Sequence, residues 1–255
     1  MTRSYGKFAT VYDQLMLDMP YVEWLGFARA SWMRYGMPAT VVDLGCGTGS
    51  ISIPLAKSGF HVYGIDLSAD MLAVARSKWD ETPQQAIRAR SGSIRWLQQD
   101  MRDWELQEPV DTVISFCDCL NYLTEEADIE AAFRAAYAGL RDGGTFLFDM
   151  HPKKQFIRYA EEQPFVLDER DVAYIWTCDF DESRCQIEHH LTIFSRGGDS
   201  RFSRFEETHE QGAYDEEWIV AALGRAGFSK VDRYADFELK PPDSDSERLF
   251  FAAIK

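Results

Sequence analysis

Residues 43–49 place an acid two residues ahead of three alternating glycines. The segment reads DLGCGTG and follows the short apolar run ATVV, so Asp43 ends a predicted strand and the glycines open a predicted helix. Glycine permits a positive φ and lets a ligand approach the backbone closely. One glycine could serve a tight strand-to-helix connection, but three in alternation behind an acid predict a ligand-binding turn.

The charge beside this turn indicates the kind of ligand. Gly45 and Gly47 match the start of the dinucleotide fingerprint GxGxxG, but Ser50 stands at its third glycine position. A pyrophosphate needs the unshielded positive end of the following helix, and here the carboxylate of Asp43 lies next to it. The pattern therefore favours a cationic ligand over a nicotinamide dinucleotide.

Two further acids end the next two predicted strands. Asp66 follows HVYGI, and Asp100 follows IRWLQQ. The carboxyl ends of parallel strands share one edge of a sheet, where such folds bind ligands. There Asp66 could accept hydrogen bonds from ribose hydroxyls and Asp100 from an adenine amino group, with Met101 beside the ring. Each acid alone could be a solvated strand end; three in succession predict a nucleoside site.

At these motifs the chain resembles a known family. VVDLGCGTG, YGIDLS, LQQDM and the run from DTVI to FDM resemble the successive nucleotide-binding motifs of class I S-adenosyl-L-methionine (SAM)-dependent methyltransferases, over residues 40–150. The opening YGKFATVYDQLMLDMPYVEW resembles the N-terminal cap of bacterial small-molecule members. SAM carries no phosphate, and its ammonium and sulfonium groups are both cationic. It is therefore the kind of ligand that the acid at the turn favours.

The resemblance implies a Rossmann-like, doubly wound seven-stranded sheet that ends in an antiparallel hairpin. It also implies SAM as the cofactor. The cap would place aromatic side chains over the cofactor, and the expected SAM-binding residues are Tyr5, Tyr12, Asp43, Gly45, Cys46, Gly47, Asp66, Leu67, Met71, Asp100, Met101 and Cys117.

The residues that could assist methyl transfer follow the fourth and fifth predicted strands. A neutral thioether leaves the sulfonium, so no general acid is needed and the protein mainly aligns and desolvates the reactants. A base helps where the attacking atom is protonated. The candidates are Asp118, Tyr122 and His151, with His209 as a further possibility. His151 could instead have a structural role at the exit of its strand.

Composition bears on the acceptor. With 42 acidic and 27 basic residues the net charge is −15, so the chain repels a polyanion on average and nucleic acid is disfavoured as a partner. CDCLNY also stands where nucleic-acid amine methyltransferases carry an Asp/Asn-Pro-Pro-aromatic motif. No apolar stretch spans a membrane or forms a signal peptide, which predicts a cytoplasmic protein. Five cysteines without a CxxC pair predict no metal site.

Periodicity divides the chain into four parts. Residues 1–36 are predicted to form a helical cap, and residues 37–163 alternate strands with helices as in a parallel α/β core. Residues 164–212 lack a helical period and predict a β-rich antiparallel insertion after strand five, with the turn RGGDS. Residues 213–255 form a closing helix and two strands. The insertion would be a substrate lid or a dimer surface, with Trp176, Arg204 and His209 as candidate substrate residues.

The sequence therefore predicts an enzyme that methylates O or N of a small molecule. It leaves open a methyltransferase acting on tRNA or protein, and a SAM-binding sensor or assembly protein without catalysis. It also leaves open whether the chain is a monomer or a homodimer.

Overall fold

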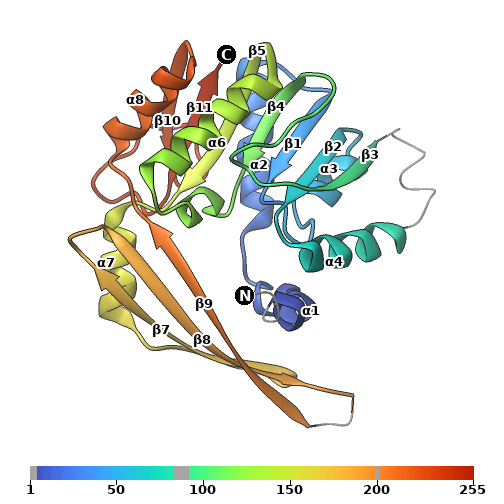
Figure 1. Cartoon of the computed structure of the whole chain (residues 1–255), viewed down its shortest axis with the longest axis vertical. Coiled ribbons are helices and arrows are strands. Elements are labelled where there is room, and N and C mark those ends of the chain that lie inside the picture. Colours follow the sequence, from blue (N-terminus) through green and yellow to red (C-terminus); the bar gives the residue numbers. More distant parts are fainter. Residues whose placement is uncertain (1–4, 83–91, 199–200) are drawn as a thin grey trace.

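The computed structural model describes residues 5–82, 92–198 and 201–255, with side chains from Phe8 onward. Its core is a seven-stranded sheet in the order β10-β11-β5-β4-β1-β2-β3, in which β11 runs antiparallel to both neighbours. This arrangement confirms the predicted doubly wound sheet and its closing hairpin (Figure 1). The strands are β1 (Thr40–Leu44), β2 (His61–Asp66), β3 (Ser93–Gln98), β4 (Val110–Ser115), β5 (Leu140–Met150), β10 (Lys230–Ala235) and β11 (Leu249–Ile254).

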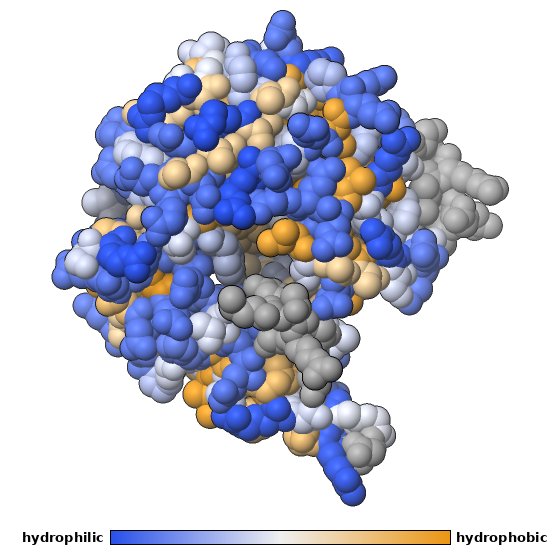
Figure 2. Space-filling view, viewed as in Figure 1, coloured by the Kyte–Doolittle hydropathy of each residue, from blue (hydrophilic) through white to orange (hydrophobic). Residues whose placement is uncertain are grey.

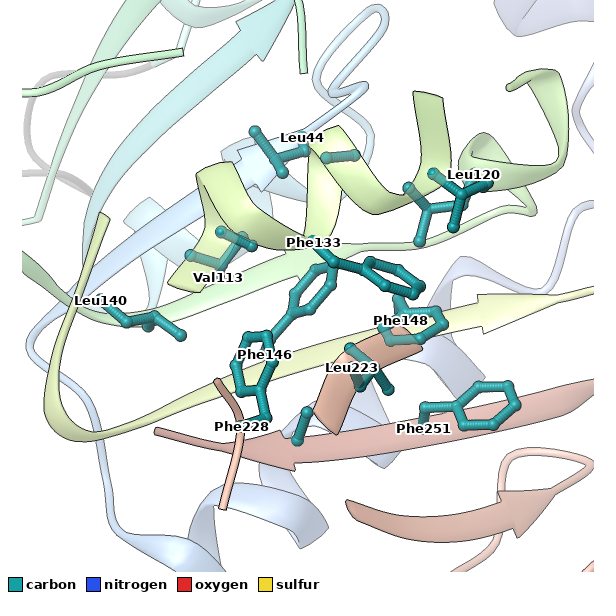
Figure 3. Close-up of a cluster of buried hydrophobic side chains, with 14 of the residues drawn as sticks. Leu44, Val113, Leu120, Phe133, Leu140, Phe146, Phe148, Leu223, Phe228 and Phe251 are labelled. Atoms are coloured by element: carbon teal, nitrogen blue, oxygen red, sulfur yellow. The ribbon is translucent and has the colours of Figure 1, made fainter. Parts of the chain in front are cut away.

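Helices cover both faces of this sheet because its strands are apolar on both sides. On β1, Val41 packs toward α2 (Tyr21–Tyr35) and α3 (Ser52–Lys57), whereas Val42 packs toward α6 (Glu126–Gly139) and α8 (Glu216–Ala226). Figure 3 shows the second side, where Phe133 of α6, Leu223 of α8 and the β5 residues Phe146 and Phe148 meet. Each such fully buried side chain contributes about 1.5–3 kcal/mol.

The predicted N-terminal cap is divided in two. Helix α2 belongs to the core, since its Trp24, Phe27 and Trp32 are fully buried against the sheet. Helix α1 (Tyr5–Leu15) lies outside it, and its Phe8 shares a small apolar cluster with Met71 of α4 (Ala69–Asp80) and with the insertion. Of these two helices, only α1 therefore lies outside the core.

The predicted insertion is a second sheet, here named sheet B, with strand order β6-β7-β8-β9 and antiparallel pairing throughout. Its strands are β6 (Phe165–Asp168), β7 (Val172–Asp181), β8 (Gln186–Arg196) and β9 (Phe202–Gly212). The turn RGGDS, predicted between β8 and β9, lies partly outside the described residues. Three elements were not predicted: the short β6, the 3-10 helix η1 (Cys119–Tyr122) and α7 (Lys153–Glu162), which is amphipathic and buries Gln155 and Phe156.

The order of the strands sets where a ligand can bind. The chain moves outward from β1 through β2 to β3 and then returns to place β4 on the other side of β1. The crevice of such a sheet opens at the carboxyl ends of the strands beside this reversal. Sheet B and α1 lie at that same end (Figure 1), and the surface is hollowed where the core meets sheet B (Figure 2). Among the described residues, no helix is long and apolar enough to cross a membrane.

Candidate functional site

The glycine turn between β1 and α3 needs glycine for two different reasons. Gly45, Gly47 and Gly49 all have positive φ, at +73°, +52° and +81°. A Cβ on Gly45 would lie 2.7 Å from Sγ of Cys119, and one on Gly49 would lie 2.7 Å from the ring of Trp96. A Cβ on Gly47 would meet nothing within 4 Å. The outer two glycines therefore permit close packing, and Gly47 presents its backbone to open space.

Asp66 at the end of β2 holds this turn in shape. Its Oδ2 accepts from the Gly47 N–H and its Oδ1 from the Ser68 N–H, both at 2.8 Å. Burial raises the pKa of Asp66, against the effect of these two hydrogen bonds. Each carboxylate oxygen can accept a further bond, so the group remains able to bind hydroxyls.

Asp43 lies beneath the turn and not at its surface. It is 2% exposed, and its Oδ2 accepts from the Ser52 hydroxyl at 2.6 Å. Burial, together with the neighbouring charge of Asp66, raises the pKa of Asp43 to about 7 despite the Ser52 hydrogen bond. A cation above the turn would favour the ionised form, so any effect of this buried acid on a ligand there would be through its charge.

The third predicted acid is held by a cation. Arg102 donates to Oδ1 of Asp100 from Nε and to Oδ2 from Nη2, at 2.9 and 2.6 Å, and it also reaches Asp128 at 3.0 Å. These bonds lower the pKa of Asp100 and keep it charged. Next to it, the side chain of Met101 approaches the glycine turn at Gly45, while Leu67 is 66% exposed after β2.

The loop after β4 is strained and packs on the glycine turn. Cys117 and Asp118 both have left-handed backbone, with φ of 62° and 50°, a conformation that costs roughly 1–2 kcal/mol for a residue other than glycine. The thiol of Cys119 contacts the Gly45 carbonyl at 3.4 Å. Burial raises the thiol pKa of Cys117 and Cys119, so both remain protonated. Such strain is found at functional sites, where the fold holds it in place.

Beyond this loop is a buried network around Arg248, the residue before β11. Its Nη1 donates to Oδ1 of Asp118 at 2.9 Å and makes a short hydrogen bond to Oδ2 of Asp149, at the end of β5. Its guanidinium lies 5.0 Å from the ring centre of Trp24, whose indole N–H donates to Asp149 at 3.1 Å. Burial opposes ionisation of Asp118, but His151 and Arg248 lower its pKa to about 2.

His151 lies in the same network with its proton-accepting atom occupied. Nη2 of Arg248 lies 3.0 Å from Nε2 of His151; arginine can only donate, so Nε2 accepts and the ring proton is on Nδ1. Burial, and then the charge of Arg248, lowers the pKa of His151 to about 4. This arrangement favours a structural role for His151 over a role as a general base.

A chain of hydrogen bonds joins sheet B to Asp118. The indole of Trp176 donates to Nδ1 of His189 at 3.0 Å, so the neutral imidazole carries its proton on Nε2, which lies 3.3 Å from Oε1 of Gln211. Nε2 of Gln211 donates to Oδ2 of Asp118 at 2.8 Å. Each of the three hydrogen bonds is donated in the direction of Asp118. This Trp176–Asp118 chain fixes the inner face of sheet B against the loop after β4.

The side chains of α1 lie over the strained loop. Burial, and the surrounding Tyr21, Cys117, Tyr122 and Cys119, raise the pKa of Tyr12. The ring of His209 lies 5.3 Å from Phe8 and 5.9 Å from Tyr122, which is 47% exposed.

Helix α1 is also tied to the glycine turn by polar contacts. Asp13 accepts from the Thr48 hydroxyl and from Lys78, both at 2.6 Å. Tyr5 begins α1, and its side chain lies outside the described part of the chain.

Two placements could not be foreseen locally. Arg204 is exposed and pairs with Glu206 at 2.5 Å, on the face of β9 opposite His209, so it lies away from the site. Buried Asn121 accepts from the His151 N–H at 3.0 Å and donates to the Gly212 carbonyl at 2.8 Å, which joins β5 to β9. Sequence reasoning missed it, as it missed Asp149, Gln211 and Arg248. Only Asp149, an acid at a strand end, offered a signal.

The comparisons with known proteins agree with this geometry. Residues 41–144 match a family model described as a methyltransferase domain. A protein of Geobacillus sp. strain WCH70 is 36% identical over 99% of this chain and 100% of its own length, and YqeM of Bacillus subtilis strain 168 is 36% identical over 98% and 97%. Both carry methyltransferase names that specify no acceptor. A SAM-dependent methyltransferase structure from Clostridium acetobutylicum aligns with a TM-score of 0.83 at 26% identity, covering 98% of each chain.

The site fits the cofactor of that family. Gly47 exposes its backbone, Asp66 can accept from hydroxyls, and the charge of Asp43 favours a cation, as a sulfonium nucleoside with an amino acid tail requires. From its motifs, its fold and its relatives, this chain is a class I SAM-dependent methyltransferase.

Proposed function

We propose that the enzyme transfers the methyl group to an oxygen or nitrogen of a small molecule by in-line displacement. The Trp176–Asp118 chain is the observation that carries the proposal. It holds sheet B over the carboxyl ends of β4 and β5, so an acceptor at Asp118 would bind beneath a roof and not in an open groove. A roofed site suits a small acceptor better than a folded RNA or protein.

The proposed cofactor half comprises the glycine turn, the strand-end acids and α1. Bound SAM supplies a methyl group activated by its sulfonium. Asp66 would accept from the ribose hydroxyls, and Asp100 with Met101 would hold the adenine. Asp43 would favour the positive charge, and Tyr12 would exclude water from above. Tyr5, Gly45, Cys46, Gly47, Leu67, Met71 and Cys117 complete the proposed set.

The proposed acceptor half lies between Asp118 and sheet B. Tyr122 and His209 face each other there, and Trp176 contributes through His189. Residues 164–212 are proposed as the acceptor lid, with α1 as a cap on the cofactor side. The exposed face of sheet B could form a dimer surface without changing this role. We propose that the protein is a monomer or a homodimer and that it is cytoplasmic.

Named relatives support a small acceptor without choosing the atom. The magnesium-protoporphyrin O-methyltransferase of Synechocystis is 38% identical over 101 residues. The dTDP-3-amino-3,6-dideoxy-α-D-glucopyranose N,N-dimethyltransferase of Streptomyces fradiae is 25% identical over 193 residues. One transfers to oxygen and the other to nitrogen.

The test is incubation of the enzyme with methyl-labelled SAM and a cell extract separated into small-molecule, RNA and protein fractions. We expect label in the small-molecule fraction, and much less label with Asp66→Ala as the matched control when SAM is kept well below the dissociation constant of that variant. Label in RNA or protein would contradict a small acceptor. SAM binding without transfer to any fraction would indicate the non-catalytic alternative.

A further inference from the structure

We propose that the acceptor atom is an amine nitrogen, which binds beside Asp118 with the carboxylates of Asp118 and Asp149 behind it. The inference rests on the proposed function and names the chemical class of the small molecule.

The first support is the balance of charge in the buried network. Asp118 and Asp149 share one guanidinium, that of Arg248; the other ion-pair contact seen among the described residues is from Nε2 of His151 to Oδ1 of Asp118 at 3.4 Å, which is charged only when the ring is protonated. The neighbouring imidazoles add no positive charge, because burial lowers the pKa of His151 and His189 to about 4 and also lowers that of His209. The network therefore carries a net negative charge next to the loop that packs on the glycine turn.

The second support is where charge develops during the reaction. The amine lone pair forms the new C–N bond while the C–S bond breaks and its electron pair goes to sulfur. The positive charge thus passes from the sulfonium to the nitrogen, and the methylammonium product can release a proton to water. Fixed negative charge beside the nitrogen stabilises this change.

The third support is that Asp118, His151 and His189 offer a hydroxyl acceptor no suitable base. An alcohol must lose its proton as it attacks, and a base works best when its pKa is near the working pH. The pKa of Asp118 is lowered to about 2. Nε2 of His151 accepts from Arg248, and Nδ1 of His189 accepts from Trp176. An amine that arrives with a free lone pair needs none of these groups.

Blocking amines before the reaction tests the proposal. The small-molecule fraction of the extract is treated with an acylating reagent that modifies amines at neutral pH and leaves alcohols, and is then incubated with enzyme and labelled SAM. We expect the treatment to remove at least about nine-tenths of the label transferred. Undiminished transfer would contradict an amine acceptor but would still agree with a small-molecule acceptor. No transfer to untreated small molecules would overturn the proposed function itself.

A pair of variants tests the role of the carboxylate. Asp118→Asn keeps the shape of the side chain and removes its charge, and we expect at least a tenfold loss in kcat/KM for the amine, with S-adenosylhomocysteine binding within twofold of wild type by calorimetry. Arg204→Ala, on the outer face of β9, should change neither value. Wild-type kcat/KM in Asp118→Asn would overturn the proposed electrostatic role, because charge at residue 118 would then not act on the acceptor.

Discussion

Nη1 of Arg248 lies 2.9 Å from Oδ1 of Asp118, although 130 positions separate the two residues in the chain. The contact exists because β11 runs antiparallel to β5 and pairs Leu249 with Met150. The first residues of β11 therefore lie beside the last residues of β5, at the edge of the sheet that holds the site. The cation of Arg248, just before the last strand, thus pairs with two acids: Asp118, which follows β4, and Asp149, near the end of β5.

Replacing Arg248 should destabilise the fold. Arg248→Met leaves Asp118 and Asp149 buried without their cation, and removing one partner of a buried ion pair typically costs about 3–5 kcal/mol. Burial already raises the pKa of Asp149 to about 6, and without Arg248 it should rise further. A carboxyl with a raised pKa keeps its proton in the folded state, so its contribution to stability is lost as pH rises.

Urea denaturation of the Arg248 variants at pH 6 and pH 8 measures this effect. Arg248→Met should lose more stability at pH 8 than at pH 6. Adding Asp118→Asn and Asp149→Asn should recover most of the loss. A single variant within about 1 kcal/mol of wild type, the size of an ordinary hydrogen bond, would show that the network does not hold this edge of the sheet.

Gln211 should act as a positioning residue for Asp118. Gln211→Leu breaks the Trp176–Asp118 chain at its last bond and leaves a buried acceptor with one donor fewer, worth about 1–3 kcal/mol. We expect KM for the acceptor to rise roughly tenfold or more, with SAM affinity nearly unchanged. Thr208→Ala, on the exposed face of the same strand, is the control. Equal losses in acceptor and SAM binding would indicate general damage to the fold.

Asp66 should be the residue on which cofactor affinity depends most. Hydrogen bonds to a charged group contribute about 1.5–3 kcal/mol each, so Asp66→Ala should weaken SAM binding by roughly 10²-fold. Asp66→Asn, which keeps one acceptor oxygen, should fall between. Isothermal calorimetry on folded protein, with Asp70→Asn in the exposed first turn of α4 as the control, gives the values. An affinity within threefold of wild type would remove Asp66 from the site.

SAM affinity should increase with pH through the neutral range. Burial raises the pKa of Asp43 to about 7, so the acid is largely protonated at pH 6, and a cationic ligand binds the ionised form better. Below this pKa the dissociation constant should rise by up to about tenfold per pH unit as protons compete with the ligand. Calorimetry at pH 6, 7 and 8 measures the trend, which Asp43→Asn should flatten. A wild-type affinity independent of pH would mean that the charge of Asp43 does not reach the ligand.

Much of the cofactor half could be predicted from the sequence because its determinants are local. A glycine turn after an apolar run, and acids at the ends of successive strands, lie within a few residues of the elements that position them. Parallel strands bring these ends to one edge whatever the distant parts of the chain do. The cap of Ser68 on α4, which accepts from the Met71 N–H, and the left-handed Gly227 after α8 are local in the same way.

The acceptor half was decided by tertiary structure. Gln211 and Asp118 are 93 positions apart, and they meet only because β9 returns to the core in one register with β8. That register places His209 inward and Arg204 outward, since neighbouring residues of a strand face opposite sides. No local pattern contains the pairing of distant strands, so the sequence alone determined the glycine turn and the strand-end acids, and the packing of β11 and sheet B decided what surrounds Asp118.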